Sequence, residues 1–136
     1  MNPHCVHQYP TVIREHHLDT FGHVNNSVYL ELLEEARWEI ITQRGYGIDK
    51  IRETGQGPTI LEIHLLFTQE VRLRESIVIH TQLVSYEKKV AQLNQWITNE
   101  EEKVCCEAAF KMGLFDVKER KLVLPTVEWL NAWGAV

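Results

Sequence analysis

The pattern of hydrophobic and polar positions predicts one long helix near the start of the chain. From about residue 26 to residue 44, apolar side chains recur at spacings of three and four, as on one face of an amphipathic helix. These apolar positions are Val28, Tyr29, Leu30, Leu32, Leu33, Ala36, Trp38, Ile40 and Ile41. A helix this apolar is expected to be largely covered by other parts of the protein. The remaining face is acidic, with Glu31, Glu34, Glu35 and Glu39, and Gly45 and Gly47 are expected to end the helix.

Extended segments lie on both sides of this helix. Residues 11–18 begin with β-branched types and are interpreted as a strand. After a turn signal at residues 55–58, four further segments carry apolar residues at alternate positions, namely 61–67, 76–86, 90–98 and 103–115. Short connections between these four favour antiparallel hairpins. A brief helix is expected at residues 126–133.

This order of elements predicts an α+β fold with a five-stranded antiparallel sheet and one long helix. The 136 residues are the usual length of a single domain, so we expect one domain over residues 1–136. A single helix cannot cover both faces of such a sheet, and self-association is the economical way to cover the other face. We therefore expect a homo-oligomer, either a homodimer or a homotetramer.

Composition narrows the range of partners. The chain has 14 Lys and Arg against 19 Asp and Glu, a net charge of -5, which argues against nucleic acid as a partner but leaves room for a small phosphorylated ligand. No run of 18 apolar residues exists, so no membrane insertion is expected. The N-terminus lacks the pattern of a secretory leader, and we expect a cytoplasmic location. Three cysteines, Cys5 and the adjacent pair Cys105 and Cys106, do not form a disulfide framework, and the pair should point to opposite faces of a strand as small core or interface residues.

The segment before the long helix carries the candidate chemistry. Asp19 stands just upstream of a helix N-terminus, where free N–H groups and the positive end of the helix dipole can hold the oxyanion formed when a carbonyl is attacked. A neighbouring carboxylate can attack that carbonyl or activate a water. A thioester suits this pair because its carbonyl is a good electrophile and a thiolate leaves readily. An Asp before a helix is more often a cap or a solvated loop residue, so the residues alone leave both interpretations open.

Residues 18–31, LDTFGHVNNSVYLE, resemble the signature of the hotdog-fold acyl-CoA thioesterases related to 4-hydroxybenzoyl-CoA thioesterase. The continuation at residues 32–38, LLEEARW, resembles the bacterial long-chain acyl-CoA thioesterase branch. The resemblance implies a sheet wrapped around the long helix and a dimer with a joined sheet. It also implies that Asp19 is the nucleophile or general base, and that a backbone N–H at or near Asn26 binds the thioester oxygen.

Further residues of the motif are candidates with simpler alternatives. His23 could contact the thioester or fix the loop, and Asn25 could contact the substrate or cap the helix. Gly22 is expected to serve a tight backbone conformation. Tyr29 is a candidate for the substrate site, although it lies on the apolar face of the helix, where core packing is the simpler role.

Other candidates lie outside the motif. His64 could border the acyl pocket, and Lys88 and Lys89, in a hairpin turn, could meet the CoA phosphates, although an ordinary charged turn explains them as well. Glu34 and Glu35 could supply a second carboxylate or form a solvated or interface helix face. Four histidines lack any repeated ligand spacing, so no metal and no cofactor are expected; they are His16, His17, His64 and His80.

The hypothesis is hydrolysis of fatty or aromatic acyl-CoA to the free acid and CoA. One alternative is hydrolysis of acyl groups on acyl carrier protein, but this acidic partner requires a positive rim that a chain of net charge -5 does not favour. A second alternative is a hotdog protein that binds acyl-CoA without turnover, which would not need Asp19 beside the helix start.

Overall fold

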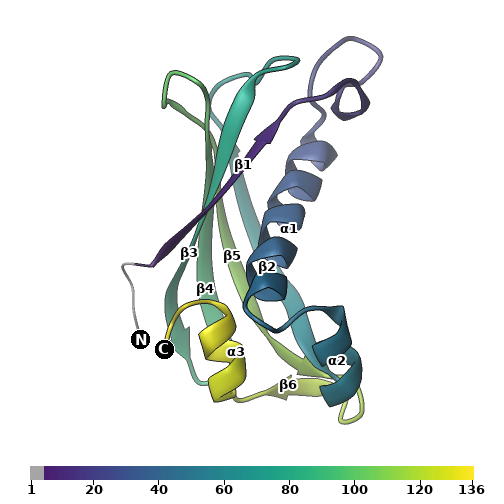
Figure 1. Cartoon of the computed structure of the whole chain (residues 1–136), viewed down its shortest axis with the longest axis vertical. Coiled ribbons are helices and arrows are strands. Elements are labelled where there is room, and N and C mark those ends of the chain that lie inside the picture. Colours follow the sequence, from purple (N-terminus) through teal and green to yellow (C-terminus); the bar gives the residue numbers. More distant parts are fainter. Residues whose placement is uncertain (1–4) are drawn as a thin grey trace.

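An antiparallel sheet of six strands wraps around one long helix in the computed structural model, which describes residues 5–136 (Figure 1). The strand order is β1-β3-β4-β5-β2, and β6 pairs with β5. Expectations about the N-terminal leader fall largely on residues 1–4, outside the described residues. The elements are β1 (Val6–Val12), the 3₁₀ turn η1 (Glu15–His17), α1 (Asn26–Gln43), α2 (Ile48–Thr54), β2 (Gln56–Phe67), β3 (Ser76–Glu87), β4 (Val90–Thr98), β5 (Val104–Asp116), β6 (Lys121–Val123) and α3 (Val127–Ala132).

The predicted long helix is confirmed as α1, and its end follows from local hydrogen bonds. Gly45 has φ +87°, a left-handed conformation that glycine adopts without steric cost. This turn lets Tyr46 N–H donate to the Ile41 carbonyl at 2.7 Å and Gly45 N–H donate to the Thr42 carbonyl at 3.2 Å. The paired bonds satisfy two of the last carbonyls of the helix and stop it there.

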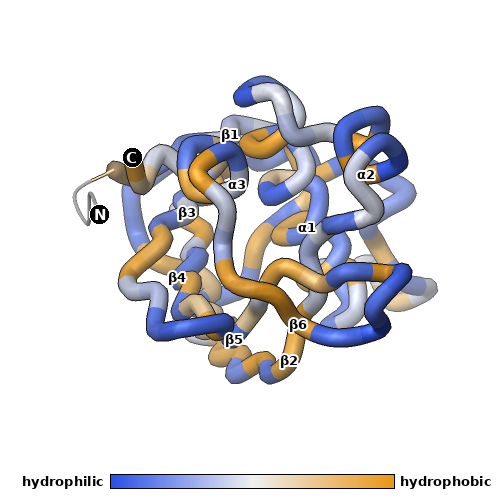
Figure 2. The backbone as a smooth tube through the Cα atoms, turned by 90° about the horizontal axis from the view of Figure 1, so that it is seen from below, coloured by the Kyte–Doolittle hydropathy of each residue, from blue (hydrophilic) through white to orange (hydrophobic). Residues whose placement is uncertain are grey.

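The helix buries its apolar stripe in the concave side of the sheet. Seen from below in Figure 2, the strands curve around α1 from β1 to β2. The buried residues of α1 are Tyr29, Leu32, Leu33, Ala36, Ile40 and Ile41. They meet the inward positions of the central strands, which include Ile77, Ile79, Leu83, Leu93, Ile97, Phe110 and Met112. The acidic residues of α1 are exposed, as its sequence predicts.

A buried polar network ties α1 to the sheet within this apolar core. The Gln95 amide nitrogen donates to the Leu33 carbonyl at 3.0 Å and to the Thr81 hydroxyl at 2.9 Å. The Gln95 amide oxygen accepts from Arg37 Nη1 at 2.9 Å, and the Arg37 guanidinium lies 4.6 Å from the centre of the Phe110 ring. Burial lowers the pKa of Arg37 to about 10. These bonds fix the position of α1 along the strands because only one register satisfies all of them.

Three irregularities alter the alternation that the sequence predicts, one of them between Leu83 and Ser85 where β3 pairs with β4. A shift between Ile60 and Glu62 interrupts the pairing of β2 with β5, so Leu61 does not share the face of Ile63 as expected from strict alternation. A second irregularity, between Ile97 and Thr98, leaves residue 105 of β5 without an opposing residue on β4. Both adjacent cysteines are buried, which agrees with small core residues.

The first strand is the main error of the sequence interpretation. The strand predicted over residues 11–18 is β1, which lies earlier at Val6–Val12, while residues 15–17 form a 3₁₀ turn. His16 and His17 therefore do not point to opposite sides of a strand, and their ring centres lie 4.1 Å apart. The position of β1 is set by its pairing with β3, and the hydrophobic pattern of residues 6–18 alone does not predict this pairing.

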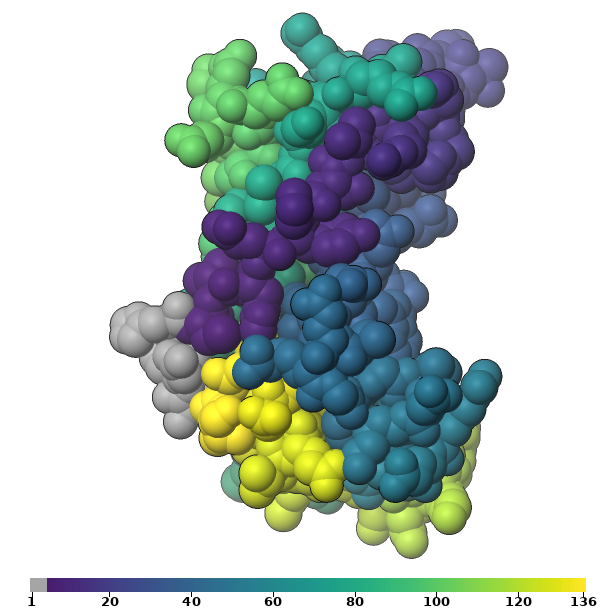
Figure 3. All heavy atoms as spheres, viewed as in Figure 1, coloured from purple at the N-terminus to yellow at the C-terminus, as the bar shows by residue number. Residues whose placement is uncertain are grey.

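The C-terminal segment forms the predicted short helix and closes one end of the fold. In α3, Trp129 is buried and Thr126 caps the first turn by accepting from Trp129 N–H at 3.1 Å. Figure 3 shows α3 and α2 side by side at this end, joined by an ion pair of 2.6 Å between Lys50 and Glu128. Within residues 5–136, the helices are too short or too polar to span a bilayer.

We predict that Gln95→Leu lowers the free energy of unfolding by about 1–3 kcal/mol, because it leaves Thr81 and Arg37 buried without their partner. Urea unfolding measures the change. The matched control is Gln92→Leu on the same strand but on the opposite face, which should alter stability by less than about 0.5 kcal/mol. Equal effects of the two variants would show that the network does not hold the helix.

Candidate active site

Residues 18–25 form a compact loop that leads directly into α1. Leu18 and Val24 pair as an isolated antiparallel bridge across its base. Asp19 N–H donates to the His23 carbonyl at 2.9 Å, and Gly22 N–H donates to the Asp19 carbonyl at 3.0 Å. The loop is therefore closed by its own backbone before the helix begins.

The Asp19 carboxylate is oriented by this loop. Its Oδ1 atom accepts from the backbone N–H of Phe21 at 2.9 Å and from that of His23 at 3.0 Å. The Oδ2 atom forms no hydrogen bond with any of residues 5–136. Oδ1 is thus held in place, whereas Oδ2 is available to bond a ligand. The Asp19 side chain is exposed on the single chain.

Gly22 has the conformational role that the sequence predicts. Its φ of +79° lies in the left-handed region, which side chains with a Cβ adopt at a cost of about 1–2 kcal/mol. No atom lies near the position that a Cβ would occupy, so the requirement for glycine comes from the backbone and not from space. The turn at Gly22 brings the amide of His23 back to Asp19.

The start of α1 leaves one donor open. Asn25 is the N-cap: its side-chain oxygen accepts from Ser27 N–H at 3.2 Å, and its carbonyl accepts from Val28 and Tyr29 N–H. Within the part of the chain that the structure describes, the N–H of Asn26 has no hydrogen-bond partner. An unsatisfied amide at the positive end of a helix is a ready site for a developing oxyanion.

His23 and Tyr29 hold structural positions near this loop. The His23 ring is exposed and lies 3.9 Å from the Glu70 carboxylate, a pair too solvated to contribute much to stability. Tyr29 is buried, its ring packs edge-on against Phe67 with centres 5.1 Å apart, and burial raises the pKa of its hydroxyl. Core packing therefore accounts for Tyr29.

Within a single chain, the three candidates outside the motif do not lie near Asp19. They are His64, Lys88 and Lys89. His64 pairs in register with Ala109 and lies with Asn94 and Trp96 over a hollow on the sheet face away from α1. Lys88 and Lys89 form the turn after β3, whose twelve residues place them about 40 Å from the Ser76 end of that strand. The β3 start, next to β1 and η1, is the end of the molecule at which the Asp19 loop lies (Figure 1).

The acidic residues of α1 that could supply a second carboxylate have structural partners. Glu35 accepts from the Tyr9 hydroxyl at 2.9 Å, and burial together with this bond raises the pKa of Tyr9 to about 12. Glu34 accepts from the Trp38 indole N–H at 3.3 Å. Among residues 5–136, no group of three or more His, Cys, Asp or Glu side chains is placed to hold a metal ion.

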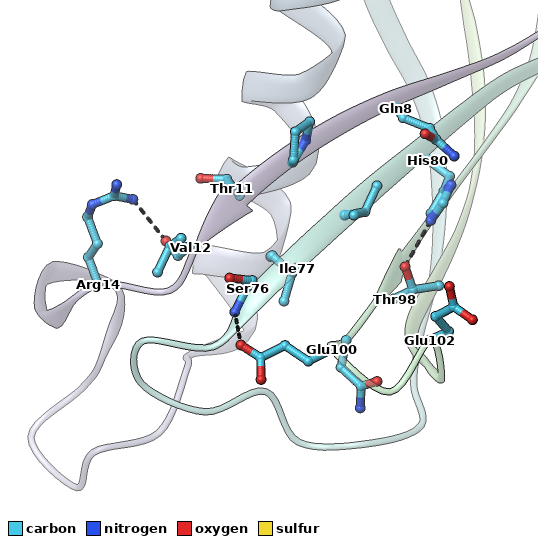
Figure 4. A pocket seen from close by; sticks show the side chains of 13 residues that line it. Gln8, Thr11, Val12, Arg14, Ser76, Ile77, His80, Thr98, Glu100 and Glu102 are labelled. Atoms are coloured by element: carbon cyan, nitrogen blue, oxygen red, sulfur yellow. Dashed lines mark hydrogen bonds between the residues drawn. The ribbon is translucent and has the colours of Figure 1, made fainter.

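A large hollow of the molecule lies away from the candidate site. It measures about 840 Å³ and lies over β1, β3 and β4, where the Gln8, His80 and Thr98 side chains gather (Figure 4). His80 bonds Thr98 at 2.9 Å, while Arg14 and Glu100 bring opposite charges to its other end. Asp19 and the start of α1 take no part in its lining.

Sequence reasoning missed one exposed aromatic residue at the site. Phe21, between Asp19 and His23, has 85% of its surface exposed, which is unusual for a large apolar side chain. An aromatic residue in an otherwise polar loop was the available signal. Its exposure on a single chain suggests that a ligand or a second copy covers it.

Comparison with known proteins finds thioesterases among the relatives of this chain. The family model described as the thioesterase-like superfamily matches residues 13–134. The chain is 31% identical over 110 residues to the long-chain acyl-CoA thioesterase FadM of Escherichia coli strain K12, covering 80% of this chain and 83% of FadM.

Two solved structures share the fold. One is Slr0204, a 1,4-dihydroxy-2-naphthoyl-CoA thioesterase from Synechocystis, with a TM-score of 0.86, 13% identity and coverage of 97% of this chain and 98% of the other. The second is SAV2348 from Staphylococcus aureus in complex with CoA, with a TM-score of 0.86, 12% identity and coverage of 94% and 81%.

We predict that Asn25→Ala lowers the free energy of unfolding by about 1 kcal/mol, because the N–H of Ser27 loses its acceptor. Thermal or urea unfolding measures the loss. Asn25→Ser is the matched control, since its hydroxyl can cap the same amide and should retain most of the stability. If Ala and Ser behave alike, capping is not the role of this residue.

Proposed function

The chain belongs to the thioesterase-like superfamily and hydrolyses acyl-CoA thioesters, and we propose that Asp19 is the carboxylate that carries the reaction. The observation that supports this role is the geometry of residues 19–26. One Asp19 oxygen is held by two backbone amides, the other is open, and the helix that follows starts with an unpartnered N–H at Asn26.

The oxygen of the thioester carbonyl is bound by the Asn26 N–H, where the helix dipole stabilises the negative charge that develops on attack. Because this donor belongs to the backbone, the Asn26 side chain itself is not required. A missing donor of this kind typically costs about 3–4 kcal/mol in the transition state. His23 contributes through its backbone N–H, which holds Asp19, and its ring is exposed beside the same loop.

Two routes use the same atoms. In the first, Asp19 Oδ2 attacks the carbonyl carbon, the C–S bond breaks, the CoA thiolate leaves, and water then hydrolyses the anhydride formed on Asp19. In the second, Asp19 removes a proton from water, the hydroxide attacks, and the thiolate leaves and takes up the proton. A single turnover in isotopically labelled water tests the first route, since label enters the Asp19 side chain only when water opens an anhydride at the Asp19 carboxyl carbon.

We further propose that the active enzyme is a homodimer or a larger homo-oligomer joined along β2. This strand forms an edge of the sheet, and four of its large apolar side chains have between 44% and 49% of their surface exposed. They are Leu61, Ile63, Leu66 and Phe67. An exposed apolar edge strand is a template for pairing with another chain, so a second copy is the natural occupant.

An antiparallel pairing of two β2 strands would also bring opposite ends of the two copies together. The Asp19 loop of one copy would then lie toward the second copy's Lys88 and Lys89, which are remote from Asp19 within one chain. In that arrangement these lysines are placed to meet the phosphates of CoA, as their charge suggests.

We predict that Asp19→Asn lowers kcat for palmitoyl-CoA by about 10²–10⁴-fold, because the amide can neither attack the carbonyl nor take a proton. The fold should be unaffected, since an Asn oxygen can still accept from Phe21 and His23. Release of free thiol, followed with a chromogenic disulfide, measures the rate. The control is Asp49→Asn in the first turn of α2, which should keep full activity.

Near-normal turnover by Asp19→Asn would contradict the proposed mechanism. Benzoyl-CoA assayed beside palmitoyl-CoA separates aromatic from fatty substrates. The same acyl group presented on CoA and on acyl carrier protein tests the carrier-protein alternative. Binding of acyl-CoA by the wild-type chain with no thiol release would favour a non-catalytic binding protein.

We predict that Ile63→Lys, at the exposed edge, weakens self-association at least about tenfold, because it places a charge in an apolar contact. Sedimentation over a range of concentrations measures the effect. Leu124→Lys is the matched control, since Leu124 is also an exposed apolar residue but lies beyond β6, away from the β2 edge. An unchanged assembly in Ile63→Lys, or dissociation in both variants, would argue against an interface at β2.

A further inference from the structure

A histidine side chain closes the short turn η1 that precedes the Asp19 loop. His17 Nδ1 accepts from the backbone N–H of Arg14 at 2.8 Å, and His17 N–H donates to the Arg14 carbonyl at 2.9 Å. A third bond, from Leu18 N–H to the Glu15 carbonyl at 3.1 Å, extends the turn to the residue before Asp19. The turn is therefore held in part by one side-chain nitrogen that acts as an acceptor.

This turn holds one of the two ends of the Asp19 loop. In Figure 1 the chain runs from the end of β1 through the turn and the loop into α1. At its far end the loop continues from Val24 directly into α1, whereas at its near end Leu18 follows η1 and pairs with Val24. A change in η1 therefore moves Leu18, and with it the Asp19 carboxylate relative to the Asn26 N–H.

The other contacts of η1 hold it less firmly. Ile13, before the turn, is buried and fixed by two backbone bonds: its N–H donates to Glu75 and its carbonyl accepts from Arg74. Beyond Ile13, the side-chain contact of the turn with the β2–β3 connection is the ion pair between Glu15 and Arg74, in which both side chains are 63% exposed. An ion pair this solvated contributes little to stability, so the bond accepted by His17 matters more.

The bond to His17 Nδ1 exists only while this nitrogen carries no proton. The donor is a backbone N–H, which cannot accept, so the direction of the bond is fixed by its geometry. A neutral imidazole has one nitrogen that accepts, whereas in the imidazolium ion both nitrogens are donors. Protonation would thus turn the Nδ1 hydrogen against the Arg14 N–H and break the contact.

Charged groups from two elements face the His17 ring. Burial lowers the pKa of His17, and the neighbouring His16, with its ring centre 4.1 Å away, and Arg14 act in the same direction. Glu35 and Glu31 on α1 act in the opposite direction but do not outweigh them. The ring is therefore neutral near pH 7, and the two carboxylates on α1 are the groups toward which a protonated ring would be drawn.

We propose that His17 is a positioning residue for Asp19: its Nδ1 atom holds η1, and η1 keeps the Asp19 carboxylate in place beside the Asn26 N–H. Because the pKa of His17 is lower in the folded chain than in the unfolded chain, its contribution to stability is complete above the unfolded value of about 6.5 and is lost as the pH falls below it. Acid therefore releases the turn and slows the reaction. The inference rests on the proposed function, since it assumes that Asp19 and Asn26 act on the thioester.

The test measures kcat for palmitoyl-CoA between about pH 7.5 and about pH 5. The wild-type rate should fall about threefold or more, since the neutral fraction of a histidine falls up to tenfold per pH unit below its pKa. His17→Asn should keep the rate at neutral pH and lose this fall, because the Asn side-chain oxygen accepts from Arg14 N–H at any pH. His17→Leu, which has no acceptor, should be about fivefold slower at neutral pH.

The matched control is His80→Asn, which should retain the acid profile of the wild type. Burial lowers the pKa of His80 as well, but this residue lies between the buried Ile79 and Thr81 on β3 and so points to the sheet face away from α1. Each rate is divided by the rate of the same variant at neutral pH, so a smaller folded fraction cancels. Circular dichroism at each pH verifies that the fold persists.

A second measurement does not require turnover. In the wild type, the nuclear magnetic resonance shift of the Gly22 amide should follow the titration of the His17 ring, because Gly22 N–H bonds the Asp19 carbonyl within the loop. In His17→Asn the Gly22 amide should no longer titrate in this range. The His80→Asn variant should titrate at Gly22 as the wild type does.

The outcomes separate this inference from the proposed function. Any one of three results overturns the inference and leaves the thioesterase activity standing: equal acid profiles of wild type and His17→Asn, full activity of His17→Leu at neutral pH, or a wild-type rate and Gly22 shift that do not change with pH. Near-normal turnover by Asp19→Asn overturns the role proposed for Asp19, even where the Gly22 amide follows His17.

Discussion

The position of α1 against the concave face of the sheet is the constraint on which the rest of this structure depends. An apolar stripe supplies the attraction, but apolar contacts alone tolerate small shifts of a helix along a sheet. The Gln95 side chain removes that freedom, since it bonds the Leu33 carbonyl, the Thr81 hydroxyl and the Arg37 guanidinium together. With the helix placed, its N-terminus carries the Asp19 loop and its C-terminal half borders a cavity beside β2.

The proposed active site combines a locally formed part with a part that depends on assembly. The Asp19 carboxylate is oriented by amides only two and four residues away, so this part of the site needs little beyond its own loop. The shielding of Asp19 from solvent, by contrast, is not provided by this loop. Asp19 and Phe21 are exposed on the single chain, and the neighbouring edge strand β2 presents apolar side chains to solvent. A second copy along β2 would exclude water from around Asp19, which would strengthen the interaction of the helix dipole with a developing oxyanion.

Short-range patterns in the sequence determined the parts of this protein whose hydrogen bonds are local. They include α1, the hairpins from β3 to β5, the helix cap at Asn25 and the loop that orients Asp19, because each is formed by residues close together in the chain. Only the tertiary structure decided where β1 lies, which face His64 takes, and that Lys88 and Lys89 are remote from Asp19 within one chain. These features depend on pairing and packing between segments that are distant in the sequence. The periodicity of either segment alone does not determine the energy of such contacts.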